Sequence, residues 1–167
     1  MHEHLMRRTL SLAERALQEG ELPIAALVVL GGRVIAEAST GERREGRLLA
    51  HAELLALEAA DRVCPFGESR RDAVLYTNLE PCLMCLGAAM SFHVGAICYA
   101  LESPSDGAVA LARDWARDEA AMPSYRLPTI IGGVLREASG ALFQRYVERY
   151  PDGGPLSEWA SSLAHLV

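Results

Sequence analysis

The sequence predicts an α/β protein, a three-layer α/β/α sandwich whose mixed central sheet has about five strands. Two observations support this fold class. Short apolar runs alternate along the chain with segments of helical periodicity, and half of the 167 residues are hydrophobic. Strands joined through helices form a sheet whose two faces must both be covered. A chain of this length can bury a substantial core as one domain.

The N-terminal segments predict a helix followed by a β-hairpin. Apolar residues recur at helical spacing from Leu5 to Leu17, and Gly20 ends that pattern. Two apolar runs follow, residues 24–30 and 33–38, separated by Gly31-Gly32. Two short apolar runs around a Gly-Gly pair are typical of two strands joined by a tight turn.

The middle of the chain predicts two helices around a buried strand. A polar loop, residues 39–47, leads into residues 48–63, whose Leu, Ala and Glu content favours a helix. Residues 73–79 form an apolar strand pattern. Pro81 then stands where a helix over residues 82–91 would begin, a position that tolerates the missing N–H of proline.

The C-terminal part continues the alternation of strands and helices. A strand is predicted over 95–101, a helix over 106–120, a weaker strand over 129–135 and a helix over 139–150. A short amphipathic helix over 156–166 follows. We interpret it as a packing or dimer-contact element.

Domain organisation and composition indicate one catalytic domain with a short tail. Residues 1–150 are expected to form the domain, and residues 151–167 a C-terminal helical tail packed on it. The sequence contains no long apolar run, which argues against export and a membrane span. Its four cysteines do not suggest a disulfide framework, so we expect a cytoplasmic protein. The formal net charge of −6 offers no general attraction to nucleic acid.

Two short motifs contain the residues suited to chemistry. Cys82 and Cys85 lie in "PCLMC", and His51 and Glu53 lie in "HAE" at the start of another predicted helix. A Cys-x-x-Cys pair alone is consistent with a redox dithiol, half of a structural zinc site or part of a catalytic metal site. The identity of the pair therefore depends on its partners in the fold.

The two motifs together favour a catalytic metal site. Cys82 and Cys85 lie one helical turn apart, and a helix N-terminus favours their thiolate forms. Two thiolates and the imidazole of His51 make three ligands, which leave one position of a tetrahedral zinc ion open. Glu53, two residues after His51, would stand beside that position as a general acid and base.

The alternatives fit the sequence less well. A closed structural zinc site needs a fourth protein ligand, and the sequence has no second Cys-x-x-Cys pair. A redox dithiol would leave the "HAE" motif unexplained. A catalytically inactive zinc-containing binding module remains an alternative, although it would have no need of Glu53.

The "HAE" and "PCLMC" motifs, in this order, resemble those of the zinc-dependent cytidine deaminase-like superfamily. The resemblance extends from about Leu5 to Tyr150 and is closest to the branch of tRNA adenosine deaminases and bacterial guanine and cytosine deaminases. It implies one zinc ion held by His51, Cys82 and Cys85. It also implies that Glu53 moves a proton during hydrolytic deamination, in which an amino-bearing ring carbon becomes a carbonyl and ammonia is released.

The residues at the family's substrate-contacting positions match the family pattern less closely than the two motifs do. Thr40 stands where purine-acting members of this branch have an Asn that contacts the base. Ser91 and residues 99–103 differ from the His and the "FGARD"-like segment of tRNA-editing members. These departures favour a small nucleobase-like substrate, with tRNA adenosine-to-inosine editing as the alternative. The resemblance further implies a homodimer, and substrate contacts at Ala26, Thr40, Ala52, Glu80, Pro81, Glu102 and Asp106.

Overall fold

The computed structural model describes residues 2–115 and 120–167. The strands are β1 (Ala25–Leu30), β2 (Arg33–Ser39), β3 (Val74–Leu79), β4 (Ala96–Leu101) and β5 (Thr129–Ile131). The helices are α1 (His2–Gln18), α2 (Glu42–Glu45), α3 (Ala52–Val63), α4 (Leu83–Phe92), α5 (Val109–Arg113), α6 (Arg136–Arg149) and α7 (Pro155–Ala164). None of the described helices is long and apolar enough to cross a membrane.

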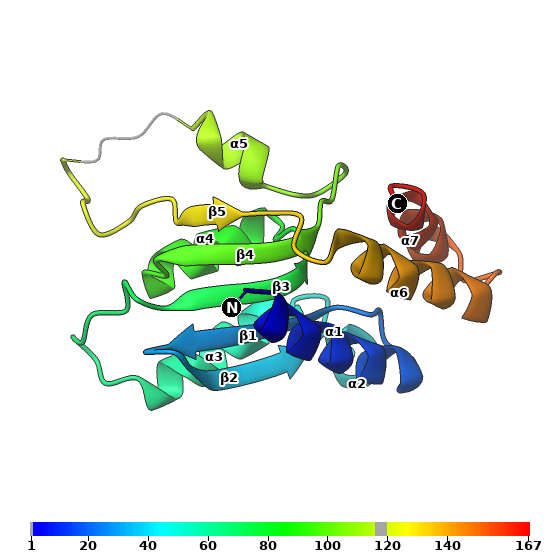
Figure 1. Cartoon of the computed structure of the whole chain (residues 1–167), viewed down its shortest axis with the longest axis horizontal. Coiled ribbons are helices and arrows are strands. Elements are labelled where there is room, and N and C mark those ends of the chain that lie inside the picture. The colour runs from blue at the N-terminus through cyan, green and yellow to red at the C-terminus, as the bar shows by residue number, and fades with distance from the viewer. Residues whose placement is uncertain (1, 116–119) are drawn as a thin grey trace.

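The five strands form one mixed sheet in the order β2-β1-β3-β4-β5 (Figure 1). β1 is antiparallel to both β2 and β3, whereas β3, β4 and β5 run parallel to one another. Parallel neighbours need crossover connections, and α4 supplies the one between β3 and β4. The predicted fold class is confirmed.

Helices cover both faces of the sheet. α3 and α4 pack on one face, where Val28 and Leu75 meet Leu86 in one hydrophobic cluster. α1 and α6 pack on the other face, where Leu27 meets Met6 in a second cluster. Neighbouring residues of β1 are thus buried on opposite faces, which explains why this strand reads as a continuous apolar run.

The C-terminal helix packs on α6. Phe143, Ala160 and Leu163 lie in a third hydrophobic cluster, and each of these side chains is buried. The rings of Phe143 and Trp159 meet edge to face at 5.9 Å. α7 is therefore anchored to the rest of the chain through apolar contacts.

Several element boundaries differ from the sequence predictions. The predicted polar loop contains α2, and the helix predicted from residue 48 begins only at Ala52, because His51 is extended and stands at the N-cap. The helix predicted over 82–91 begins at Leu83 with Cys82 as N-cap, so Pro81 lies before the cap and not at the first helical position.

Three further elements differ from their predictions in the C-terminal half. The strand predicted over 129–135 ends at Ile131, because Gly132 and Gly133 follow and Gly133 has a φ of +83°. The helix predicted from residue 139 begins earlier, at Arg136. Of the helix predicted over 106–120, residues 109–113 are helical and residues 116–119 lie outside the described residues.

Candidate metal centre and adjoining cavity

Two helix starts bring His51, Cys82 and Cys85 together. His51 is the N-cap of α3, Cys82 is the N-cap of α4, and Cys85 follows in the first turn of α4. The ligand atoms of the three side chains all lie within 4.8 Å of one another. Within residues 2–115 and 120–167, this is the group of His, Cys, Asp and Glu side chains with the spacing of a metal site.

The distances within this group fit a tetrahedral zinc ion. His51 Nδ1 lies 3.7 Å from Cys82 Sγ and 3.6 Å from Cys85 Sγ. Zn–S bonds of about 2.3 Å and a Zn–N bond of about 2.0 Å at tetrahedral angles place nitrogen and sulfur about 3.5 Å apart. The side chains are therefore already arranged around a point where a zinc ion fits.

Proton affinities within the group are strongly coupled. A hydrogen bond with Cys85 and the neighbouring imidazole lower the pKa of Cys82 to about 4. The contact with Cys82 raises the pKa of His51 to about 9, against the effect of burial. Its hydrogen bond with Cys82 and burial raise the pKa of Cys85. The two sulfurs and the ring nitrogen share protons among themselves. A bound metal cation would displace these protons, because metal ligands must be deprotonated.

Glu53 stands beside the group on the first turn of α3. Its side chain is buried, and Oε1 accepts a hydrogen bond of 3.1 Å from Thr77 Oγ1 on β3. Oε2 lies 3.6 Å from Cys85 Sγ. Burial raises the pKa of Glu53. A buried carboxylate with a raised pKa takes up a proton more readily than an exposed one, as a proton carrier requires.

A cavity of about 180 Å³ opens onto the group. Its apolar walls come from the loop after α1, the start of α3, the end of β3 and α7. The apolar lining residues are Leu22, Ile24, Ala52, Leu79, Leu156 and Trp159. The polar lining residues are Thr40, Glu42, His51, Glu53, Glu80, Cys82 and Asp106. A small apolar cleft with a few polar groups is typical of a site for a small organic ligand.

The family model for the cytidine and deoxycytidylate deaminase zinc-binding region matches residues 1–101, which include both motifs. This chain belongs to that deaminase family. The zinc-binding deaminase superfamily inferred from "HAE" and "PCLMC" is thereby confirmed, and zinc is the metal of this family's site.

Individual relatives agree with this assignment. The tRNA-specific adenosine deaminase of Bacillus subtilis is 30% identical over 145 residues, which cover 86% of this chain and 87% of the relative. A solved structure from work on A-to-I editing by tRNA:A34 deaminases has a TM-score of 0.69 at 30% identity and covers 83% of this chain and 98% of its own. The guanine deaminase of Nitrosomonas europaea has a TM-score of 0.67 at 28% identity. The match covers 86% of this chain and 83% of the guanine deaminase chain.

Four of the predicted substrate contacts line the cavity of this deaminase-family chain, and three do not. The four lining residues are Thr40, Ala52, Glu80 and Asp106. Ala26 lies inside the sheet, where its neighbours on both sides are strands. Pro81 lies in the turn before Cys82, outside the cavity lining. Glu102 is also absent from the lining, because the Arg136 guanidinium donates hydrogen bonds to both of its carboxylate oxygens.

Among the lining residues that were not predicted, Glu42, Leu156 and Trp159 come from segments for which the sequence suggests another role. Glu42 comes from α2, within a segment that the sequence analysis treated as a polar loop. Leu156 and Trp159 come from α7, for which the sequence predicts a packing or dimer-contact element. No spacing pattern marks these residues, because their approach to the cavity depends on how α2 and α7 fold back onto the helix starts.

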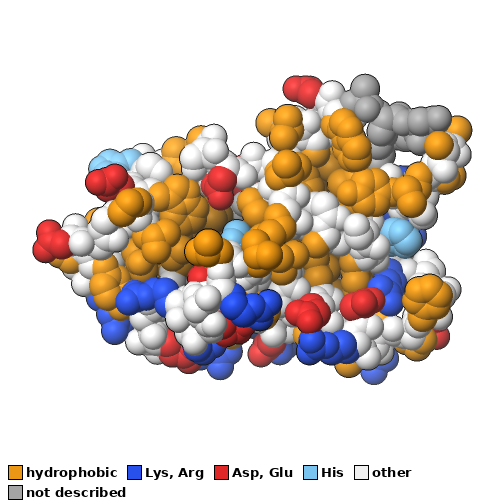
Figure 2. Space-filling model, turned by 180° about the vertical axis from the view of Figure 1, so that it is seen from behind, with side chains coloured by type: hydrophobic (Ala, Val, Ile, Leu, Met, Phe, Trp, Pro, Cys, Tyr) orange, Lys and Arg blue, Asp and Glu red, His pale blue; other side chains and the backbone are white. Residues whose placement is uncertain are grey.

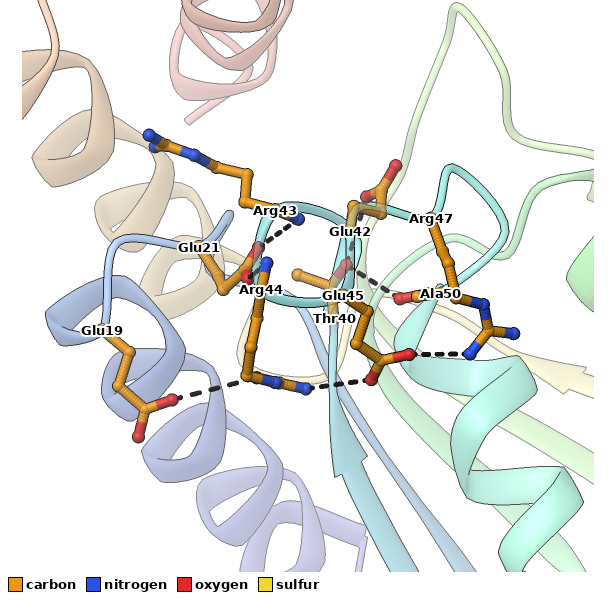
Figure 3. Close-up of polar contacts among 9 residues, drawn as sticks. All are labelled: Glu19, Glu21, Thr40, Glu42, Arg43, Arg44, Glu45, Arg47 and Ala50. Atoms are coloured by element: carbon orange, nitrogen blue, oxygen red, sulfur yellow. Dashed lines mark hydrogen bonds and ion pairs between the residues drawn. The ribbon is translucent and has the colours of Figure 1, made fainter.

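Three arginines near Glu42 contact protein groups, and Figure 3 shows the ion pairs of Arg44 and Arg47. The Arg43 guanidinium donates to the carbonyl oxygen of Gly20 at 2.8 Å. The Arg44 guanidinium lies 3.5 Å from the Glu45 carboxylate, and the Arg47 guanidinium donates to that carboxylate at 2.7 Å. The shared Glu45 carboxylate offsets part of the charge of Arg44 and Arg47, which weakens their attraction to an incoming phosphate, whereas Arg43 contacts a neutral carbonyl oxygen and keeps its charge.

Proposed function

We propose that this protein is a zinc-dependent hydrolase that deaminates a small amino-bearing nucleobase or related heterocycle. Membership of the deaminase family supplies the reaction class. The observation that carries the finer proposal is the cavity of about 180 Å³, which is small and rich in carboxylates. Sites for drug-sized ligands usually measure about 300–1,000 Å³, so this cavity suits a single heterocyclic ring system.

We assign roles to four side chains. His51, Cys82 and Cys85 would hold the zinc ion, which when bound acidifies water and acts as a Lewis acid. Glu53 would take a proton from the attacking water and deliver it to the departing amine, so that an amine and water become a carbonyl and ammonia. Thr77 would hold the Glu53 carboxylate in place through the hydrogen bond to Oε1.

The electrostatics around the cavity favour a substrate without phosphate. Glu42, Glu80 and Asp106 line the cavity in addition to Glu53. These carboxylates repel anions, and the whole chain has a formal net charge of −6. A neutral free base or nucleoside meets no such penalty.

A second candidate function is adenosine-to-inosine editing of tRNA. Its support comes from the relatives named as tRNA-specific adenosine deaminases, at 30% identity. An RNA substrate would need cations along its phosphate path. The pairing of Arg44 and Arg47 with Glu45 weakens such a path on this side of the cavity.

We also propose a homodimer. An apolar groove of about 460 Å³ lies between α4 and α5 and includes Leu83, Leu111 and Trp115, whose side chains are at least half exposed. Figure 2 shows hydrophobic side chains gathered on this face of the molecule. Exposed apolar patches of this kind often mark protein interfaces. Sedimentation analysis of the protein should give twice the monomer mass of 18.1 kDa, and a monomer at micromolar concentration would reject this proposal.

The function is tested by ammonia release from zinc-loaded protein. Guanine, adenine, cytosine, their nucleosides, other aminoheterocycles and an anticodon stem-loop RNA are offered in parallel, with Glu53→Ala as the control. We expect turnover of a free base or nucleoside that disappears in the variant. Turnover confined to the RNA would replace the proposal by tRNA editing. Zinc binding without turnover of any compound would instead favour an inactive binding module.

A further inference from the structure

Glu42 reaches the cavity from a helix that the rest of the fold holds in place. The carboxylate of the buried residue Glu21 accepts hydrogen bonds from the backbone N–H groups of Arg43 at 3.2 Å and Arg44 at 2.6 Å. Figure 3 shows these contacts at the first turn of α2. The side chain of Glu42 therefore extends from a backbone position that is fixed by Glu21.

The two carboxylate oxygens of Glu42 have different surroundings. Oε2 lies 3.1 Å from the hydroxyl of Thr40, and that buried hydroxyl also lies 3.2 Å from the carbonyl oxygen of Ala50. Oε1 lies 3.9 Å from His51 Nε2, beyond hydrogen-bond distance. Among the described residues, no hydrogen-bond donor reaches Oε1. One oxygen is thus held by Thr40, and the other has unused acceptor capacity at the cavity.

The other carboxylates of the lining are more fully engaged. One carboxylate oxygen of Glu80 accepts a hydrogen bond from the backbone N–H of Ser103, and the other accepts one from the backbone N–H of Val109, each at 3.0 Å. Asp106 accepts hydrogen bonds from the hydroxyls of Ser103 and Ser105, both through Oδ1. These bonds hold the loop after β4 in place. Glu42 is the lining carboxylate that combines an oxygen without a donor and a position next to His51, so it can accept a hydrogen bond from a substrate held at the metal centre.

We propose that Glu42 determines substrate specificity by accepting a hydrogen bond from an N–H group that the reaction does not remove. The inference rests on the proposed deaminase function. A carboxylate only accepts, whereas the Asn expected at the position of Thr40 in purine-acting relatives can accept and donate. The preferred substrate is accordingly a neutral aminoheterocycle with a second N–H donor, such as a ring N–H or a further amino group.

Matched substrate pairs test this inference. Adenine and 2,6-diaminopurine can lose the same 6-amino group and differ by one additional amino donor. Guanine and 2-aminopurine can lose the same 2-amino group, but 2-aminopurine lacks the ring N1–H. The ratio of kcat/KM within each pair is measured for the wild type, for Glu42→Gln and for Glu45→Gln. Glu45 is the control, because it lies on the same helix, pairs with Arg44 and Arg47, and does not line the cavity.

The wild type should favour the donor-rich member of at least one pair by about tenfold to a hundredfold, the range for a hydrogen bond to a charged group. Glu42→Gln should reduce that preference to a few-fold while the poorer substrate keeps its rate, and Glu45→Gln should change neither. An unchanged preference in Glu42→Gln, or an equal loss for both members with loss of bound zinc, would overturn the inference. The second outcome would assign Glu42 to holding His51 instead.

Binding separates this inference from the function itself. The dissociation constants of the same pairs are measured by calorimetry on zinc-loaded Glu53→Gln protein, with and without Glu42→Gln. A binding preference that depends on Glu42 supports the inference even if the wild type releases no ammonia, a result that would reject only the proposed function. Absence of any such preference in binding and in turnover would reject the inference.

Discussion

Leu163→Ala should destabilise the protein and weaken substrate binding together. Leu163 is fully buried between α7 and α6, in the cluster that contains Phe143. Loss of a fully buried leucine side chain costs about 2–5 kcal/mol of unfolding free energy. With a urea m-value of about 2 kcal/mol/M, the unfolding midpoint should fall by about 1–2.5 M. Because Leu156 and Trp159 line the cavity from the same helix, KM should rise while kcat falls less.

Urea unfolding is monitored by tryptophan fluorescence, and steady-state kinetics are measured in the absence of urea. Ser162→Ala is the control, because Ser162 is exposed on the same helix and should change the unfolding free energy by less than about 0.5 kcal/mol. A midpoint that moves by less than 0.3 M in Leu163→Ala, a cut-off well below the expected fall of about 1–2.5 M, would refute the packing argument. A lowered midpoint with unchanged KM would refute the role of α7 as a wall of the cavity.

Three further predictions follow from the site and its surroundings. Glu53→Gln should lower kcat by about 10²–10⁴-fold with zinc retained, as measured by turnover and metal analysis, and a smaller loss would contradict its role in proton transfer. Cys82→Ser, or treatment with a chelator, should remove zinc and lower the Tm, because bound metal stabilises the folded state by mass action; an unchanged Tm would argue against zinc binding at this group. The hydrogen bonds from Arg136 lower the pKa of Glu102, so the pair stabilises the fold above the ordinary glutamate pKa and this contribution disappears as pH falls through the lowered value. Thermal unfolding across the acidic range should therefore show a wild-type advantage over Glu102→Gln near neutrality that shrinks at low pH, and a constant difference would contradict the pairing.

Much of the fold could be predicted because local patterns and global packing agree. The apolar run of β1 is buried by helices on both faces, and the spacing of Cys82 and Cys85 matches one helical turn. The boundaries were less predictable. Glu42 to Glu45 form a helix because Glu21, distant in sequence, supplies the acceptor for two N–H groups of its first turn.

The sequence by itself determined the chemistry of the metal centre. The residue types in "HAE" and "PCLMC", and their positions at two helix starts, are local properties that identify a three-ligand zinc site and its deaminase family. Only the tertiary structure decided what surrounds that centre. It brings Glu42 and Trp159 to the same cavity and ties Glu102 to Arg136 away from it. Such contacts join residues far apart in the chain, and they depend on packing that no short pattern of residues encodes.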